Sequence, residues 1–256
     1  MKVFDRYPKF ITSDPRLDRV GAYHISNDFM TLRHTSFFNS EILENKTVLD
    51  LGCCVGASGA WVLANSAKFY CGVEYHKDLA NIAIDNLSVF DKNTWQVVNT
   101  SVESFLEEST EKYDIVIASG IIYAFFEPIP ILKNIAMRSN TVIIESVHPK
   151  IPGIDIETAS VIAYKRQHML YGTTKTELCF NSAIPSMTFV IDYMKHHGFE
   201  CDLSVNNDLK KYLPDVYQTD RFGIKLVKNR NSEISQGFLS ATTFPKDVKI
   251  KNWSIK

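Results

Sequence analysis

The sequence lacks an excess of either charge. Its 256 residues carry 28 basic and 29 acidic side chains, for a formal net charge of −1. A protein that binds nucleic acid usually carries a basic surplus, so this balance disfavours a nucleic-acid partner, although a local basic face would still suffice for one. Apolar residues make up 45% of the chain and charged residues 22%, which is ordinary for a globular domain and argues against a fibrous or disordered chain.

The sequence also lacks a long apolar run. The longest, at 115–126, is broken by Ser119 and Gly120 and is too short to span a bilayer. The first eight residues contain charges and a proline where a secretory signal would be continuously apolar. We therefore expect no membrane partner and a cytosolic location.

The five cysteines lack the spacing of a metal site. They contain no Cys-x-x-Cys pair and no cysteine and histidine pattern typical of zinc, and they stand at positions 53, 54, 71, 179 and 201. We expect reduced thiols and no metal.

What the sequence does contain is an alternation of strand and helix patterns. Short apolar runs predict strands at 47–50, 69–75, 94–98, 113–119 and 141–145. Helical spacing or helix signals lie between and after them, at 57–67, 78–90, 102–108 and 128–137. Such alternation is typical of a parallel sheet with right-handed crossovers. A helix at 186–197 and two last strands at 200–205 and 221–228 follow, the strands separated by a long loop through Pro214.

The loop after the first strand carries the strongest functional signal. The strand reaches an acid, Asp50, and the chain then passes two glycines, Gly52 and Gly56, before a helix. Glycine accepts a positive φ and leaves no Cβ between the backbone and a ligand. In an open parallel sheet the first strand-to-helix turn is the usual cofactor contact, so we interpret residues 47–60 as a cofactor loop.

The acids around this loop indicate which cofactor it binds. The glycine spacing does not match the G-x-G-x-x-G pattern of nicotinamide sites, and Asp50 would repel a pyrophosphate. S-adenosylmethionine instead carries a sulfonium and an ammonium and no phosphate. Glu74 ends the second strand 22 residues after Gly52, where a carboxylate can accept hydrogen bonds from ribose hydroxyls. Together the two acids favour S-adenosylmethionine.

These residues resemble a known family. The segments 48–56, 72–74 and 113–117 are similar to the first, second and fourth motifs of class I S-adenosylmethionine-dependent methyltransferases. The resemblance implies an α/β, Rossmann-like, doubly wound, mostly parallel seven-stranded sheet with the last strand antiparallel. Cys54 departs from the pattern, because the family usually has a glycine there and a positive φ would strain a cysteine.

The resemblance assigns residues to the cofactor. At the third motif the family often has an acid that holds adenine, whereas here residues 100–102 offer hydroxyl groups and backbone amides. The predicted cofactor-binding residues are Asp50, Gly52, Cys53, Gly56, Glu74, Tyr75, Ser101, Val102 and Ser119.

The organisation of the chain follows from these assignments. Residues 1–46 form an N-terminal arm and helix that cap the acceptor pocket, and residues 47–229 form the methyltransferase domain. Residues 147–185, rich in proline and aromatics, are an insertion over the carboxyl edge of the sheet, and residues 230–256 are a polar tail.

Methyl transfer requires alignment of the two reactants more than a dedicated nucleophile. Where the acceptor is protonated a base helps, and His148 after the fifth strand is the candidate, against the simpler interpretation of a structural loop histidine. Glu145 either points into the site or only ends its strand. Tyr123 either lines the pocket near the methyl group or belongs to the core.

The sequence leaves the acceptor open. Our first hypothesis is methyl transfer to an oxygen or nitrogen of a small molecule. The segments 119–123 and 143–146 are also similar to bacterial enzymes that alkylate the wobble uridine of tRNA, and five basic residues support an RNA alternative: Lys210, Lys211, Lys225, Lys228 and Arg230. A third interpretation is a partner protein without catalysis. The oligomeric state is not predicted.

Overall fold

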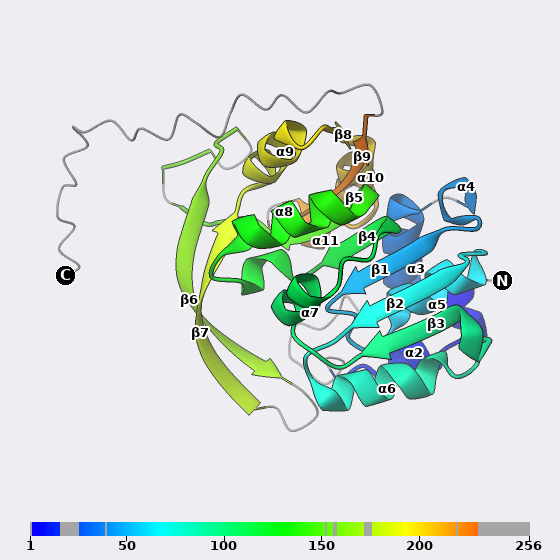
Figure 1. Cartoon of the computed structure of the whole chain (residues 1–256). Helices are drawn as coiled ribbons and strands as arrows, with labels where there is room; N and C mark the ends of the chain where they lie inside the picture. Colours follow the sequence, from blue (N-terminus) through cyan, green and yellow to red (C-terminus); the bar gives the residue numbers. More distant parts are fainter. Residues whose placement is uncertain are drawn as a thin grey trace.

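The computed structural model in Figure 1 describes residues 2–15, 26–38, 40–151, 153–155, 158–171, 176–218 and 220–229. A seven-stranded sheet runs through the molecule in the order β3-β2-β1-β4-β5-β9-β8. The strands are β1 (Thr47–Leu51), β2 (Phe69–Val73), β3 (Trp95–Val98), β4 (Tyr113–Ser119), β5 (Ser139–Val147), β8 (Phe199–Asp202) and β9 (Arg221–Lys228).

The direction of the strands confirms the predicted fold class. The first five strands are parallel to one another, and β9 is antiparallel to both of its neighbours, β5 and β8. The last strand is therefore the antiparallel one. Because β9 runs backwards, its first residue lies at the edge where β4 and β5 end.

Helices cover both faces of this sheet, so that it is doubly wound. On one face lie α3 (Asn27–Phe37), α5 (Ala57–Ala64), α6 (Lys77–Leu87) and α10 (Ser204–Tyr212), and on the other α7 (Val102–Glu108), α8 (Pro128–Arg138) and α9 (Met187–His196). Strand residues alternate between the two cores. Val48 packs under the first set of helices, and Leu49 and Leu51 pack under the second.

The N-terminal arm is built into the first of these cores. Its short helices α1 (Val3–Arg6) and α2 (Lys9–Thr12) bury Phe4 and Phe10. The ring of Phe4 lies 5.9 Å from that of Trp61 in α5. Ser26 caps α3 by accepting the Phe29 N–H at 3.1 Å, and a short helix, α4 (Ser40–Leu43), leads to β1. The arm thus contributes to the fold itself.

The long loop predicted before the last strand is wrong. Residues 204–217 form two helices, α10 and α11 (Pro214–Tyr217). Val205 and Leu209 are four residues apart on the buried side of α10. Pro214 marks a helix start, since proline fits the first helical turn, where no intrahelical N–H bond is lost.

The predicted insertion contains a hairpin. Strands β6 (Ile162–Tyr171) and β7 (Thr176–Pro185) pair with each other and form a separate two-stranded sheet, visible at the left of Figure 1. The Ala183 N–H donates to the Phe125 carbonyl at 2.8 Å. This bond joins β7 to the segment after β4, which contains the 3-10 turn η2 (Ile122–Ala124). Another 3-10 turn, η1 (Lys92–Thr94), precedes β3.

None of the helices in the described ranges combines the length and the apolar character that a bilayer crossing requires.

Candidate functional site

The loop after β1 makes a tight turn at the carboxyl edge of the sheet. Three of its residues have positive φ: Gly52 at 75°, Cys54 at 51° and Gly56 at 82°. The Gly52 and Cys53 N–H groups donate to the Val73 carbonyl at 2.8 and 3.0 Å. A Cβ on Gly52 would lie 2.9 Å from Ile121 Cδ1, so both conformation and space require glycine there.

Glu74, directly after β2, anchors this loop through hydrogen bonds. Its Oε2 accepts the Cys54 N–H and its Oε1 accepts the His76 N–H, both at 2.9 Å. Only 8% of the residue is exposed. A carboxylate has about four acceptor positions, so both oxygens keep capacity for ligand hydroxyl groups. Glu74 therefore explains the positive φ of Cys54 and still suits a ribose.

Asp50 is a buried acid that accepts a hydrogen bond from the Tyr70 hydroxyl at 2.8 Å. Burial raises its pKa to about 7, although the Tyr70 hydrogen bond and the charge of Arg33 oppose the rise. A buried acid that loses its proton near neutrality is stabilised in its charged form by a nearby cation. Asp50 thus suits a ligand that carries a positive charge, such as the ammonium of S-adenosylmethionine.

Two buried polar side chains fix the loop to the surrounding helices. Asn86, the polar exception on the apolar face of α6, donates to the Val55 carbonyl at 3.0 Å and to Ser13 Oγ at 2.8 Å. His34 lies 3.4 Å from Ser58 Oγ at the start of α5. Burial, with the charge of Arg33, lowers the pKa of His34 to about 3, so its imidazole is neutral in the physiological range.

The other predicted cofactor residues lie near this edge and differ in burial and hydrogen bonding. Ser101 caps α7 by accepting the Ser104 N–H at 3.1 Å, and Val102 is buried. Tyr75 is 68% exposed beside Glu74, so its ring is available to stack on a ligand. Ser119, at the end of β4, donates to Glu145 Oε2.

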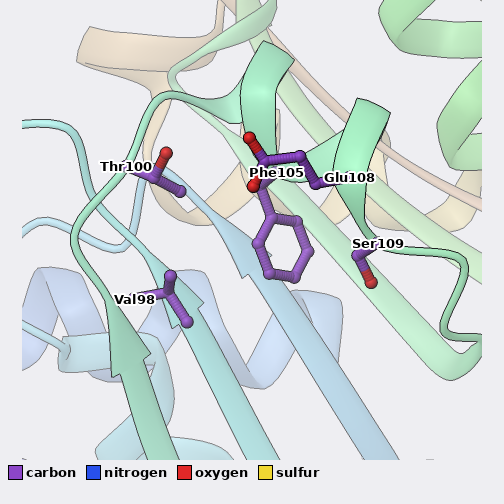
Figure 2. A pocket seen from close by; sticks show the side chains of 5 residues that line it. All are labelled: Val98, Thr100, Phe105, Glu108 and Ser109. Carbon is purple, nitrogen blue, oxygen red and sulfur yellow. The ribbon is translucent and has the colours of Figure 1, made fainter.

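A hollow of about 280 Å³ lies beside Ser101 (Figure 2). It opens between β3 and α7 and is lined by Val98, Thr100, Phe105, Glu108 and Ser109. None of these is a predicted cofactor residue, and neither Asp50 nor Glu74 borders the hollow. The assignment of the cofactor site therefore depends on the strand ends and not on this cavity.

Glu145, in β5, forms the centre of a charged cluster. Its Oε2 accepts hydrogen bonds from Arg33 of α3, which also bonds Ser119. Its Oε1 accepts from Arg221 Nε at 2.9 Å and from the Tyr217 hydroxyl at 2.8 Å. Although burial disfavours its charged form, the two guanidinium groups hold the pKa of Glu145 well below its usual range. Such a carboxylate is a poor proton acceptor and a good anchor for the arginines.

The three predicted catalytic residues do not meet. Glu145 faces α3, whereas His148 is buried against Phe222, which belongs to the core under the opposite face, with ring centroids 5.0 Å apart. Tyr123 lies in η2, and Arg221 Cζ is 5.8 Å from the centre of its ring. Only Glu145 and Tyr123 therefore border the same cluster.

Arg33 and Arg221 are the site residues that the sequence did not reveal. Neither belongs to a motif, and Glu145 is 112 residues from the first and 76 from the second. One signal existed for Arg221. It is the first residue of an expected antiparallel strand, which must begin at the edge where the parallel strands end.

The basic residues that favoured an RNA partner are partly used within the fold. Lys225 pairs with Asp202 at 2.9 Å, and Lys228 donates to the Ala136 carbonyl at 3.3 Å. Arg230 lies outside the described residues. Lys225 and Lys228 therefore already make contacts within the fold.

Comparisons with known proteins agree with this geometry. Residues 49–139 match the methyltransferase domain family. No curated protein matches the chain significantly.

Two solved structures illustrate the fold. The N-terminal domain of EvdMO1 with SAH bound is 16% identical, with a TM-score of 0.59, over 82% of this chain and 84% of that one. An S-adenosylmethionine-dependent methyltransferase described as putative, from Listeria monocytogenes, is 14% identical, with a TM-score of 0.56, over 77% of this chain and 98% of that one.

The strain at Cys54 gives a first prediction. We expect Cys54→Gly to raise the free energy of unfolding by about 1 kcal/mol in urea titrations, because glycine accepts the positive φ without a Cβ clash. Cys54→Ala is the matched control, since it removes the thiol but keeps the Cβ. An equal gain in both variants would show that the thiol, and not the backbone, is the source.

The cluster around Glu145 gives a second prediction. Glu145→Gln should lower the free energy of unfolding by about 3–5 kcal/mol at pH 7, because it leaves two largely buried guanidinium groups without their carboxylate. Asp202→Asn breaks the more exposed pair with Lys225 and should cost about 0.2–1 kcal/mol.

The stability difference between wild type and Glu145→Gln should also depend on pH. A depressed folded pKa means that the contribution of Glu145 is complete above the ordinary glutamate pKa of about 4.3 and is lost as the pH falls below it. Urea titrations between pH 3 and 7 should therefore bring wild type and Glu145→Gln closer together at the acid end. A constant difference over this range would contradict the assigned role.

Proposed function

We propose that the chain is a class I S-adenosylmethionine-dependent methyltransferase that transfers a methyl group to an oxygen or nitrogen of a small molecule. The match of residues 49–139 to the methyltransferase domain family supports this proposal. When bound, the cofactor supplies a methyl group on a positively charged sulfur. The residues of this chain bind, orient and shield the reactants, which is most of what an in-line displacement requires.

Residues at the ends of β1 and β2 are proposed to hold the cofactor. Asp50 would accept the ammonium and Glu74 the ribose hydroxyls, using acceptor positions beyond those that already hold Tyr70 and the loop amides. Gly52 and Gly56 allow the backbone to approach the ligand. Tyr75, Ser101 and Val102 are proposed for the adenosine end.

Two segments border the carboxyl ends of β4 and β5, and this arrangement supports a small molecule as the methyl acceptor. Arg33 brings α3 to the ends of β4 and β5, and the bond between Ala183 and Phe125 brings β7 to the segment after β4. A helix that precedes the sheet and a strand inserted between β5 and β8 therefore both border this edge. A polynucleotide requires an extended basic groove. The contacts of the lysines described above do not indicate one.

We propose that Glu145 and His148 have different roles in proton transfer. Glu145 is held ionised, so we propose that it positions Arg33 and Arg221 and takes no proton. His148 remains the proposed base for a protonated acceptor, provided that its ring leaves the contact with Phe222. We also infer a reducing compartment such as the cytosol, since Cys53, Cys71 and Cys201 are reduced thiols.

The raised pKa of Asp50 predicts how cofactor affinity depends on pH. A cation binds the ionised acid, so the affinity for S-adenosylmethionine should rise by up to about tenfold per pH unit below pH 7 and level off above it. Binding below pH 7 should release a proton, which calorimetry in buffers of different ionisation enthalpy measures.

Asp50→Asn tests the assignment. It should weaken binding by about 1–3 kcal/mol and remove the pH dependence. Asp114→Asn is the control, because Asp114 holds Thr47 at the opposite end of β1, at 2.9 and 3.0 Å. If Asp50→Asn keeps the wild-type pH profile, another group governs it.

The class of acceptor is tested with methyl-labelled S-adenosylmethionine and a cell extract divided into RNA, protein and small-molecule fractions. We expect the label in the small molecules, and none there with Asp50→Asn at low cofactor concentration. Label in the RNA would support the wobble-uridine alternative. Cofactor binding without label in any fraction would support a partner protein without catalysis.

A further inference from the structure

Arg221 lies on the far side of the site from the predicted cofactor residues. Asp50 lies near the end of β1 and Glu74 follows β2, whereas β9 begins with Arg221 at the same edge, two places beyond β4 in the order β1-β4-β5-β9. The carboxyl ends of β4 and β5 therefore lie between the cofactor loop and Arg221. An acceptor bound next to the methyl group would extend along this edge towards β9.

The charges around Arg221 do not balance. Arg33 and Arg221 share one carboxylate, that of Glu145, which uses a different oxygen for each. Among the described residues, Glu145 is the only carboxylate within ion-pair distance of Arg221. The cluster of Arg33, Arg221 and Glu145 therefore has one positive charge in excess. The Arg221 side chain is 23% exposed, whereas the Glu145 side chain is 5% exposed.

Gly120 has no side chain, so it leaves the position of a Cβ unfilled next to this charge. It follows β4 with a φ of 70°, and its N–H donates to the Glu145 carbonyl at 2.8 Å. A Cβ built on Gly120 would lie 3.5 Å from Arg221 Nη2 and 3.9 Å from the Tyr123 hydroxyl. Chain neighbours of Gly120 aside, no other heavy atom of the described residues lies within 4 Å of that point.

The two atoms that border this position are both suited to an anion. Arg221 uses Nε for Glu145, so that bond does not exhaust its five N–H donors. A phenol hydroxyl can likewise donate its proton to a ligand oxygen. Guanidinium and hydroxyl donors together match a carboxylate or a phosphate.

We propose that Arg221 and Tyr123, across Gly120, bind an anionic group on the methyl acceptor, and that this group is not the one that is methylated. The inference rests on the proposed function and names its substrate class: a small molecule with a carboxylate or phosphate in addition to the reacting oxygen or nitrogen. Oxygens that accept bonds from a guanidinium have their lone pairs engaged, which makes them poor nucleophiles. The methyl–sulfur bond breaks and a methyl–oxygen or methyl–nitrogen bond forms elsewhere on the acceptor. Sulfur keeps the electron pair, and the proton of a protonated acceptor passes to the base proposed above, His148.

The labelled small-molecule fraction tests the charge of the acceptor. After reaction with the full chain and methyl-labelled S-adenosylmethionine, we expect the labelled product to be retained on an anion exchanger at pH 8 and eluted by salt. Labelled product in the flow-through would overturn the inference while leaving the proposed function intact. A complete lack of labelled small molecules would overturn both.

Two treatments of the retained product identify the anion. Phosphatase moves the label to the flow-through where the anion is a phosphate monoester and leaves it retained where it is a carboxylate, and either result supports the site. Mild alkali that releases the label as methanol would show a methyl ester. The carboxylate would then be the acceptor itself, which contradicts the proposal.

Variants test the residues with the retained acceptor. Arg221→Lys should raise the KM for the acceptor about 10-fold or more, and Tyr123→Phe about 2- to 10-fold, with kcat and the Kd of S-adenosylmethionine changed far less. Tyr123→Phe keeps the ring, so it tests the site even where Arg221→Lys weakens the fold.

A matched control separates recognition from stability. Arg138→Lys alters a buried arginine whose contacts lie in α7 and α8 and after them, away from this site, and it should leave the KM unchanged. Unchanged KM values in both Arg221→Lys and Tyr123→Phe, or equal increases in all three variants, would overturn the assignment.

Discussion

The site is organised by the sharing of one carboxylate between two arginines. Glu145 lies inside the protein, where an isolated charge is costly, and Arg33 and Arg221 offset that cost by bonding its two different carboxylate oxygens. Because Arg33 belongs to the arm before the sheet and Arg221 to its last strand, the ion pairs join both ends of the fold at β5. The arm is therefore a structural part of the site, held by Phe4 beneath and by Arg33 at the edge.

The charges along the carboxyl edge are arranged by strand. Asp50 and Glu74 place acids at β1 and β2, where we propose that the cationic cofactor binds, and the two arginines place a positive surplus at β5 and β9. The parallel sheet brings all of these strand ends to one line, and the antiparallel β9 adds its first residue to it. Opposite charges at the two ends of this line favour a fixed order for cofactor and acceptor.

Sequence patterns were sufficient wherever the constraint was local. The strand at 113–119 and the helix at 102–108 have the predicted bounds, since a buried parallel strand and a capped amphipathic helix are each encoded over a few residues. The segment 204–217 was misjudged because Pro214 is compatible with both a loop and a helix start. Only the packing of Val205 and Leu209 against the sheet decides between them.

By itself, the sequence determined the fold class and predicted the cofactor loop, because Asp50, the glycines and Glu74 act through the spacing of adjacent strands and turns. Only the tertiary structure decided the charge at the ends of β5 and β9. Whether Glu145 is a base or an anchor depends on Arg33 and Arg221, which reach it from 112 and 76 residues away. The pKa of a carboxyl group depends on the charges packed against it, and no local pattern records which distant side chains those will be.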